Sequence, residues 1–107
     1  MRIPLFKSQD SLIRRLRLVE ESELGSLLDE LRAVETPTVI GFLNQHGYNI
    51  AQQEPRVRQY FGYIKYLLRD GIGIKIACKL NGRDPKANLN GSDFIPKLVG
   101  SVLDDSA

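Results

Sequence analysis

Two short apolar runs, each followed by polar residues, most constrain the fold of this chain. Thr38–Leu43 is apolar on both faces and has the length of a buried strand. Tyr63–Leu68 is a second strand candidate of the same length. The residues after each run are helical in pattern, and strands that alternate with helices favour a parallel sheet. The pattern therefore predicts an α/β domain with a mostly parallel sheet.

The spacing of apolar residues predicts three helical segments around these strands. They are an amphipathic helix from Leu24 to Val34, a partly helical segment at 49–60, and a helix at 72–80. Asn81-Gly82 supplies the stop of the third segment. Its inward face is expected to comprise Ile72, Ile76, Ala77 and Leu80, widened by Ile74 and Cys78. Helices on both faces of the sheet would make a Rossmann-like domain of three layers.

The two ends of the chain are less regular. Residues 1–11 show no periodicity and are expected to be a flexible N-terminus, whereas alternation within 12–19 predicts a half-buried strand. A last helix is predicted near Ser92, with Asp93 as its N-cap and Pro96 in its first turn. Its inward residues are expected to be Phe94, Ile95, Leu98, Val99, Val102 and Leu103.

No further strand follows that last helix in the sequence. We therefore expect residues 12–107 to form a partial α/β domain that is incomplete at the C-terminus. Part of the helix's apolar face would then lack a covering layer, which predicts self-association or partial unfolding at this end.

Composition excludes several classes of function. The net charge is only +2 and the basic residues are scattered, so nothing argues for nucleic-acid binding. No long uncharged apolar run is present, and the N-terminus lacks a signal-peptide core, so we expect a cytoplasmic protein. The single cysteine, Cys78, excludes an intrachain disulfide and is interpreted as a small buried residue. The only histidine, His46, is interpreted as a loop residue rather than a metal ligand.

Three polar segments adjoin the apolar elements and form the candidate site. Asn44-Gln45-His46 follows the first strand, Asp70-Gly71-Ile72-Gly73 follows the second, and Asn90-Gly91-Ser92-Asp93 precedes the last helix. The carboxyl ends of parallel strands share one edge, where ligands bind, so the first two segments should converge. The third offers free backbone N–H groups suited to a phosphate.

Asp70 is the strongest catalytic candidate. A carboxylate at the end of a strand, beside glycines that leave room for a substrate, can act as a general base for a sugar hydroxyl. Asp-Gly is also a common turn dipeptide, and without other evidence a turn is the more frequent explanation of this pair than catalysis. Similar alternatives hold for Asn44, which can bond its own loop, and for Asp93, which can cap a helix. Gly71 and Gly73 are too few for a dinucleotide fingerprint, which disfavours a generic nucleotide-binding module.

Taken together, these segments resemble successive blocks of the WecB/TagA/CpsF family, glycosyltransferase family 26, and they stand in the same order. The blocks are Phe42-Leu43-Asn44-Gln45-His46, Tyr66-Leu67-Leu68-Arg69-Asp70-Gly71-Ile72-Gly73, Leu80-Asn81-Gly82 and Gly91-Ser92-Asp93-Phe94-Ile95-Pro96. The resemblance covers Leu16 to Val99, which is about the first half of a typical member.

The resemblance implies an inverting glycosyltransferase without a metal or other cofactor. Such an enzyme moves N-acetylmannosamine or a similar sugar from a UDP-sugar onto an undecaprenyl-diphosphate-linked sugar, as in teichoic-acid or exopolysaccharide synthesis. Asp70 matches the family's proposed base. The matching substrate-site residues are Asn44, Gln45, Gly71, Gly73, Gly91, Ser92 and Asp93.

The resemblance also bears on partners and location. Peripheral contact with the inner face of a bacterial membrane is expected only through the later part of the family's chain. These 107 residues alone are expected to be too short for catalysis. The alternative is a non-catalytic half-domain that binds a sugar, a nucleotide or a partner chain.

The sequence departs from the family's usual pattern at three positions. Phe42 stands where many members have threonine, and Arg69 stands where many have proline. Asn88 occupies the place of an arginine that is common shortly before the Gly-Ser-Asp block. The loss of that cation puts the handling of a diphosphate in doubt, or marks a branch with another sugar preference.

Overall fold

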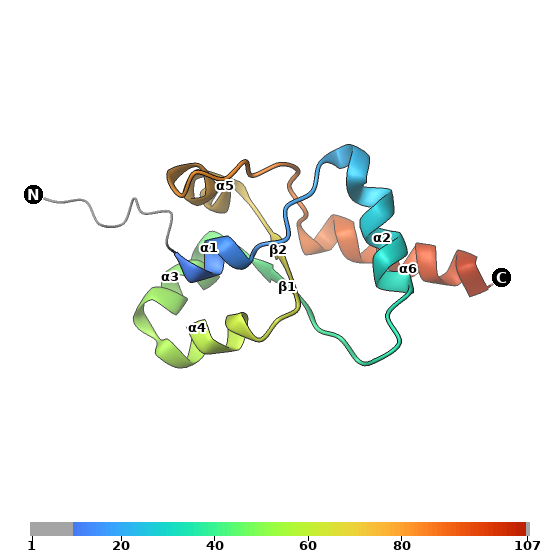
Figure 1. Cartoon of the computed structure of the whole chain (residues 1–107), viewed down its shortest axis with the longest axis horizontal. Helices are drawn as coiled ribbons and strands as arrows, with labels where there is room; N and C mark the ends of the chain where they lie inside the picture. The colour runs from blue at the N-terminus through green and yellow to red at the C-terminus, as the bar shows by residue number, and fades with distance from the viewer. Residues whose placement is uncertain (1–9, 107) are drawn as a thin grey trace, which may run out of the picture.

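The computed structural model describes residues 10–106 and shows a mixed fold of helices and two strands (Figure 1). The elements in chain order are α1 (Ser11–Arg15), the 3-10 helix η2 (Glu21–Glu23), α2 (Leu24–Arg32), β1 (Ile40–Leu43), α3 (Gln45–Gln53), α4 (Pro55–Gly62), β2 (Tyr66–Arg69), α5 (Ile72–Leu80) and α6 (Gly91–Ser106). The flexible segment expected at 1–11 lies outside the described residues except for its last two, which begin α1.

The two predicted strands pair in parallel and form the sheet. Ile40 lies opposite Tyr66, and Leu43 lies opposite Arg69. Because α3 and α4 connect the strands, β1 and β2 run in the same direction and end at the same edge. Both strand predictions are confirmed, although each strand begins two or three residues later than its apolar run.

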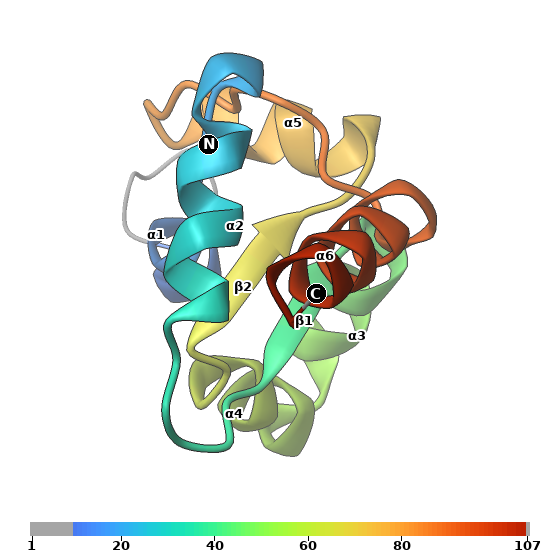
Figure 2. The ribbon, with the colours of Figure 1, turned by 90° about the vertical axis from the view of Figure 1, so that its right-hand side faces the viewer.

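Alternate residues of the strands face two different helical layers. Leu43 and Leu67 are buried in a cluster with residues of α1, α3, α4 and α5. Phe42, Tyr66 and Leu68 belong to a second cluster with residues of α2 and α6. Figure 1 shows the strands between these two groups of helices, and in Figure 2 α2 and α6 lie in front of the strands. The prediction of a three-layer α/β fold with a parallel sheet is therefore confirmed.

The segment expected to be a half-buried strand within 12–19 begins instead as a helix. The Asp10 carboxylate accepts hydrogen bonds from the backbone N–H groups of Leu12 and Ile13, at 2.9 and 3.1 Å, and so caps α1. Both of these apolar residues are buried by the helical conformation. Strand character survives only at Arg17, whose N–H donates to the Leu67 carbonyl at 2.8 Å. The strand prediction was wrong for α1 because the Asp10 cap was not recognised.

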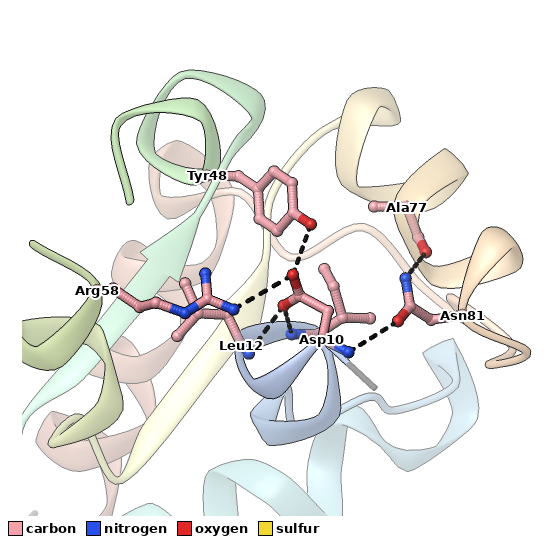
Figure 3. Close-up of polar contacts among 7 residues, drawn as sticks. Asp10, Leu12, Tyr48, Arg58, Ala77 and Asn81 are labelled. Carbon is pink, nitrogen blue, oxygen red and sulfur yellow. Dashed lines mark hydrogen bonds and ion pairs between the residues drawn. The ribbon is translucent and has the colours of Figure 1, made fainter. Parts of the chain in front are cut away.

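A polar cluster around Asp10 joins α1 to the neighbouring helices (Figure 3). The Tyr48 hydroxyl donates to Asp10 Oδ2 at 2.7 Å, and Arg58 Nη2 lies 3.3 Å from the same oxygen. The Asp10 N–H donates to Asn81 Oδ1. Burial alone would raise the pKa of Asp10, but the bonds from Tyr48 and the Ile13 N–H, with the Arg58 charge, outweigh it and lower that pKa. A five-residue helix is not stable by itself, so these contacts hold α1 in place.

The helix predicted at 72–80 is confirmed as α5, but it buries a different face. Ile74 and Cys78 are fully buried, whereas Ile72 and Ile76 are 73% and 56% exposed, and Leu80 is exposed as well. Apolar residues surround most of this helix, so their spacing allows two inward faces. Contact with the sheet selects the face that carries Ile74 and Cys78.

The last predicted helix is confirmed as α6, but its start was assigned wrongly. Asn90, not Asp93, caps the helix, because Asn90 Oδ1 accepts the Asp93 N–H at 2.9 Å. Asp93 is the third residue of the helix and accepts a return bond from Asn90 Nδ2 at 3.1 Å. Pro96 consequently lies in the second turn rather than the first.

Only part of the apolar face of α6 turns inward. Phe94 is buried and Leu98 is half-buried, both against the cluster shared with α2. The inward prediction was wrong for four residues that are 40–62% exposed: Ile95, Val99, Val102 and Leu103. This exposed side of α6 agrees with the expectation that part of the face would lack a covering layer.

Candidate functional site

The first two polar segments leave the sheet at the same edge. The Asp70 N–H extends the strand pairing and donates to the Leu43 carbonyl at 3.0 Å. Asn44 directly follows Leu43, so Asn44 and Asp70 begin two adjacent connections at the carboxyl end of the sheet. This is the edge at which parallel α/β sheets bind their ligands.

Asn44 uses its side chain to begin a helix. Its Oδ1 accepts the Gly47 N–H at 2.8 Å and caps α3. The interpretation of His46 as a loop residue was therefore wrong, because residues 45–47 form the first turn of α3. His46 is exposed in this turn.

Gln45 and Gly73 lie in direct contact across the two connections. A Cβ atom added at Gly73 would come within 2.8 Å of the Gln45 Cβ, which is closer than real Cβ atoms approach one another. The Gln45 side chain is further held by a bond from its Nε2 to Asn49 Oδ1 at 3.0 Å. Gly73 therefore provides the space in which Gln45 rests on the start of α5.

Asp70 is half-buried, and its carboxylate accepts no hydrogen bond from any residue that the structure describes. The chain then turns sharply at Gly71, whose φ of +94° lies in the region that favours glycine. This turn makes Gly71 the N-cap of α5. Asp70 thus lies at a fixed turn of the backbone, between the end of β2 and the N-cap of α5.

Arg69 is the first site residue whose role the sequence did not predict. Its side chain is buried, with 4% exposure, at the end of β2. Each of its nitrogens donates to a backbone carbonyl: Nε to Pro85 at 2.9 Å, Nη1 to Gly71 at 2.9 Å, and Nη2 to Lys86 at 2.8 Å. These bonds hold the loop after α5 against the Asp70–Gly71 turn. Every residue has a backbone carbonyl, so the sequence does not reveal which residues Arg69 contacts. The only signal of its role in the sequence is the unusual arginine directly before Asp-Gly.

Asn88 is the second such residue. Its Oδ1 accepts the Gly71 N–H at 2.7 Å. The neighbouring Leu89 N–H donates to the Arg69 carbonyl at 3.0 Å, which aligns this loop with the end of β2. The loop before α6 is therefore part of the same edge as Asp70.

The third polar segment reaches this edge through its first residues only. A Cβ atom at Gly91 would lie 3.5 Å from the Phe42 ring, so the start of α6 packs on β1. Ser92 is exposed, and Asp93 is engaged with Asn90 in the helix cap. Asp93 also lines an open depression of about 180 Å³, whose lining residues are Glu21, Leu24, Asn88, Leu89, Asp93, Phe94 and Lys97. Asn88 connects this depression to the Asp70 turn.

Two features are absent from the part of the chain that the structure describes. No group of three or more His, Cys, Asp or Glu side chains within residues 10–106 is arranged to hold a metal ion. No helix in that part of the chain is long and apolar enough to cross a membrane.

Comparison with known families decides the identity of the chain. The profile of the glycosyl transferase WecG/TagA/CpsF family matches residues 12–105. The chain belongs to this family. The match extends from α1 to α6 and includes all three polar segments. No curated protein and no solved structure matches the chain significantly.

Arg69 and Asn88, two positions at which the sequence was expected to depart from the family's pattern, meet at Gly71 in this structure. Arg69 donates to the carbonyl of Gly71, and Asn88 accepts from its N–H. The two side chains are thus structurally coupled.

Proposed function

We propose that this chain carries the base-bearing, acceptor-side part of an inverting glycosyltransferase. The donor is a UDP-sugar, N-acetylmannosamine or similar, and the acceptor is an undecaprenyl-diphosphate-linked sugar used in cell-surface polysaccharide synthesis. Membership of the WecG/TagA/CpsF family supports the reaction type. The observation that carries the proposal is the position of the half-buried Asp70 directly after β2, where its N–H donates to the Leu43 carbonyl at the edge of a parallel sheet that Asn44 shares.

In the proposed reaction Asp70 accepts the proton of the attacking acceptor hydroxyl. The acceptor oxygen forms a bond to the anomeric carbon of the donor, and the bond from that carbon to the UDP oxygen breaks. UDP leaves with the bonding electrons, and the configuration at the anomeric carbon inverts. A sugar hydroxyl attacks poorly until its proton is removed, so a positioned base accelerates this step by about 10²–10⁴-fold.

The other residues of the edge have supporting roles in this proposal. Gln45, Gly71 and Gly73 shape the surface beside the base, and Gly91, Ser92 and Asp93, at the start of α6, complete the substrate site next to this edge. The proposal requires no metal ion or cofactor. It assigns the protein to the inner face of a bacterial membrane, where a lipid-linked acceptor would be met.

The test is a transfer assay on purified protein. UDP release is measured with UDP-N-acetylmannosamine and undecaprenyl-diphosphate-linked N-acetylglucosamine for the wild type, Asp70→Asn and Asp29→Asn. Asp29 is a matched control because it is an exposed aspartate on α2. We expect Asp70→Asn to lower the rate by at least about 10²-fold and Asp29→Asn to leave it unchanged. Equal and measurable rates for the wild type and Asp70→Asn would reject Asp70 as the base, whereas a wild type that releases no UDP would favour the non-catalytic alternative.

A second function is favoured by the exposed apolar side of α6. Ile95, Val99 and Val102 are 40–50% exposed on successive turns, as expected of a surface that another chain covers. In this alternative the chain is a non-catalytic module that binds a sugar, a nucleotide or a partner chain. Binding of UDP detected by NMR, without UDP release from the donor in the assay above, would favour this alternative over catalysis.

A further inference from the structure

Two side chains from different segments hold the opposite ends of the Gly71 residue. The Gly71 N–H donates to Asn88 Oδ1 at 2.7 Å, and the Gly71 carbonyl accepts from Arg69 Nη1 at 2.9 Å. We call this pair of hydrogen bonds the Gly71 clamp. Gly71 directly follows the proposed base, so the clamp acts on the backbone that carries the Asp70 carboxylate.

Arg69 makes the Gly71 clamp rigid. A buried guanidinium is costly unless its donors are satisfied, and here Gly71, Pro85 and Lys86 supply three carbonyl acceptors. No carboxylate pairs with Arg69 among the residues that the structure describes. The planar, forked shape of guanidinium fixes the direction of all three bonds. A single side chain therefore ties the Gly71 turn to the loop at 85–86.

Asn88, further along the same loop, accepts the second hydrogen bond of the clamp. It is exposed, so its short bond to Gly71 is not forced by burial. Asn88 also lines the depression that Asp93 and Lys97 border. A change at Asn88 is thus transmitted to the Asp70 turn on one side and to the depression on the other.

The backbone on both sides of the Asp70 side chain is fixed as a result. The Asp70 N–H is bonded to the Leu43 carbonyl, and both polar groups of Gly71 are in the clamp. Gly71 has a φ of +94°, a conformation open to many alternatives for glycine, so these bonds select one of them.

We propose that Arg69 and Asn88 are positioning residues for the Asp70 carboxylate. They act through the Gly71 peptide and do not touch the reacting atoms. This inference rests on the proposed function of Asp70 as the base. It gives the two side chains one shared role, the fixed orientation of the turn that bears the base.

The test pairs Asn88→Asp with Asn88→Leu. Aspartate keeps an oxygen acceptor for the Gly71 N–H, whereas leucine has a similar size and no acceptor. Gln53→Leu, at an exposed position at the end of α3, is the control for adding a leucine to the surface. The readouts are amide exchange and the backbone order parameters at Asp70 and Gly71, measured by NMR, together with kcat and KM in the transfer assay.

We expect Asn88→Leu to speed exchange of the Gly71 amide about tenfold, the factor that corresponds to one lost hydrogen bond. The order parameters should fall from about 0.85 towards about 0.6 at the turn and stay unchanged at Leu67 and Leu68. Turnover should fall through kcat, with KM for the UDP-sugar unchanged, and Asn88→Asp should retain both properties. Arg69→Lys keeps the positive charge but loses the forked guanidinium, so it should also speed exchange of the Gly71 amide.

The outcomes separate this inference from the proposed function. Unchanged exchange and order parameters at Gly71 in Asn88→Leu overturn the clamp, even if Asp70→Asn abolishes transfer. A mobile turn with unchanged kcat shows that the clamp does not position the base, and also overturns the inference. Should Asp70→Asn retain full transfer activity, the proposed function fails, and the catalytic meaning of the clamp fails with it. The Asn88 variants decide the matter even if Arg69→Lys does not fold.

Discussion

The Gln45 side chain occupies the space that any side chain at position 73 would need. Because a Cβ at position 73 would approach the Gln45 Cβ to 2.8 Å, Gly73→Ala must displace Gln45 or the start of α5. Overpacking of this kind costs about 1–3 kcal/mol, and the higher helix propensity of alanine offsets less than about 1 kcal/mol of it. We expect Gly73→Ala to lower the free energy of unfolding, measured by urea denaturation.

The control for this prediction is Gly25→Ala. Gly25 lies inside α2, and a Cβ there meets no atom within 4 Å. Alanine should stabilise this helix by about 0.5–1 kcal/mol. Equal effects of the two substitutions would show that the Gln45–Gly73 contact does not restrict position 73.

Removal of the Tyr48 hydroxyl should weaken the anchoring of α1. Burial, and then the hydrogen bond to Asp10, raises the pKa of Tyr48 from 10 to about 12. The contribution of this group to stability is therefore complete below pH 10 and is lost as the pH rises from 10 towards 12. Tyr48→Phe should cost about 1 kcal/mol at neutral pH and should make stability less sensitive to pH above 10. A wild type and variant with parallel alkaline profiles would contradict this assignment.

The pair between Arg17 and Glu30 should make stability depend on pH in acid. Hydrogen bonds from Arg17, and then from the Tyr66 hydroxyl, lower the pKa of Glu30 from 4.5 to about 2. Its contribution is present above pH 4.5 and is lost as the pH falls towards 2. Because both charged side chains are about 40% exposed, we expect only about 0.2–1 kcal/mol.

Glu30→Gln should reduce the loss of stability between pH 4.5 and 2, measured by urea denaturation across that range. Glu35→Gln is the matched control, because Glu35 is exposed in the loop after α2. If both variants lose stability in acid as steeply as the wild type, the Arg17–Glu30 pair does not contribute.

The thiol of Cys78 should be unreactive in the folded protein. Its side chain is fully buried in the layer of α5, and burial raises its pKa. The thiolate is the reactive form, so modification requires unfolding. We expect labelling by an aromatic disulfide reagent to be slow in buffer and to accelerate with urea in step with global unfolding. Rapid labelling in buffer would show that α5 opens locally.

The exposed side of α6 should promote self-association at high concentration. Val99 and Val102 are 50% and 46% exposed and lie on this side. The double substitution Val99→Lys and Val102→Lys should shift sedimentation towards the monomer, since charges disfavour burial of this surface. Lys97→Gln is a control at an exposed position of the same helix. A wild type that remains monomeric at millimolar concentration would contradict the prediction.

Much of the candidate site was predictable because its signals are local. The apolar runs that became β1 and β2 end in polar residues, and parallel strands bring such ends to one edge. The stop of α5 was likewise predictable, since Gly82 adopts a φ of +74° just after the helix. The family blocks located Asn44, Asp70 and Gly73, but they did not show that Gln45 rests on Gly73.

Errors arose where a distant partner decides between two local solutions. The apolar residues around α5 and α6 allow more than one inward face, and packing on the sheet selected Ile74, Cys78 and Phe94. At the start of the chain, the Asp10 cap and its contacts with Tyr48 outweighed a weak strand pattern.

The sequence by itself determined the class of fold, the order of the central elements and the edge that carries Asp70, because periodicity and turn residues act over a few positions. Tertiary structure alone decided how that edge is held. The partners of Arg69 are backbone carbonyls up to 17 residues away, and Asn88 meets Gly71 across the same interval. Backbone groups are identical in every residue, so such contacts can be recognised only after the chain has folded.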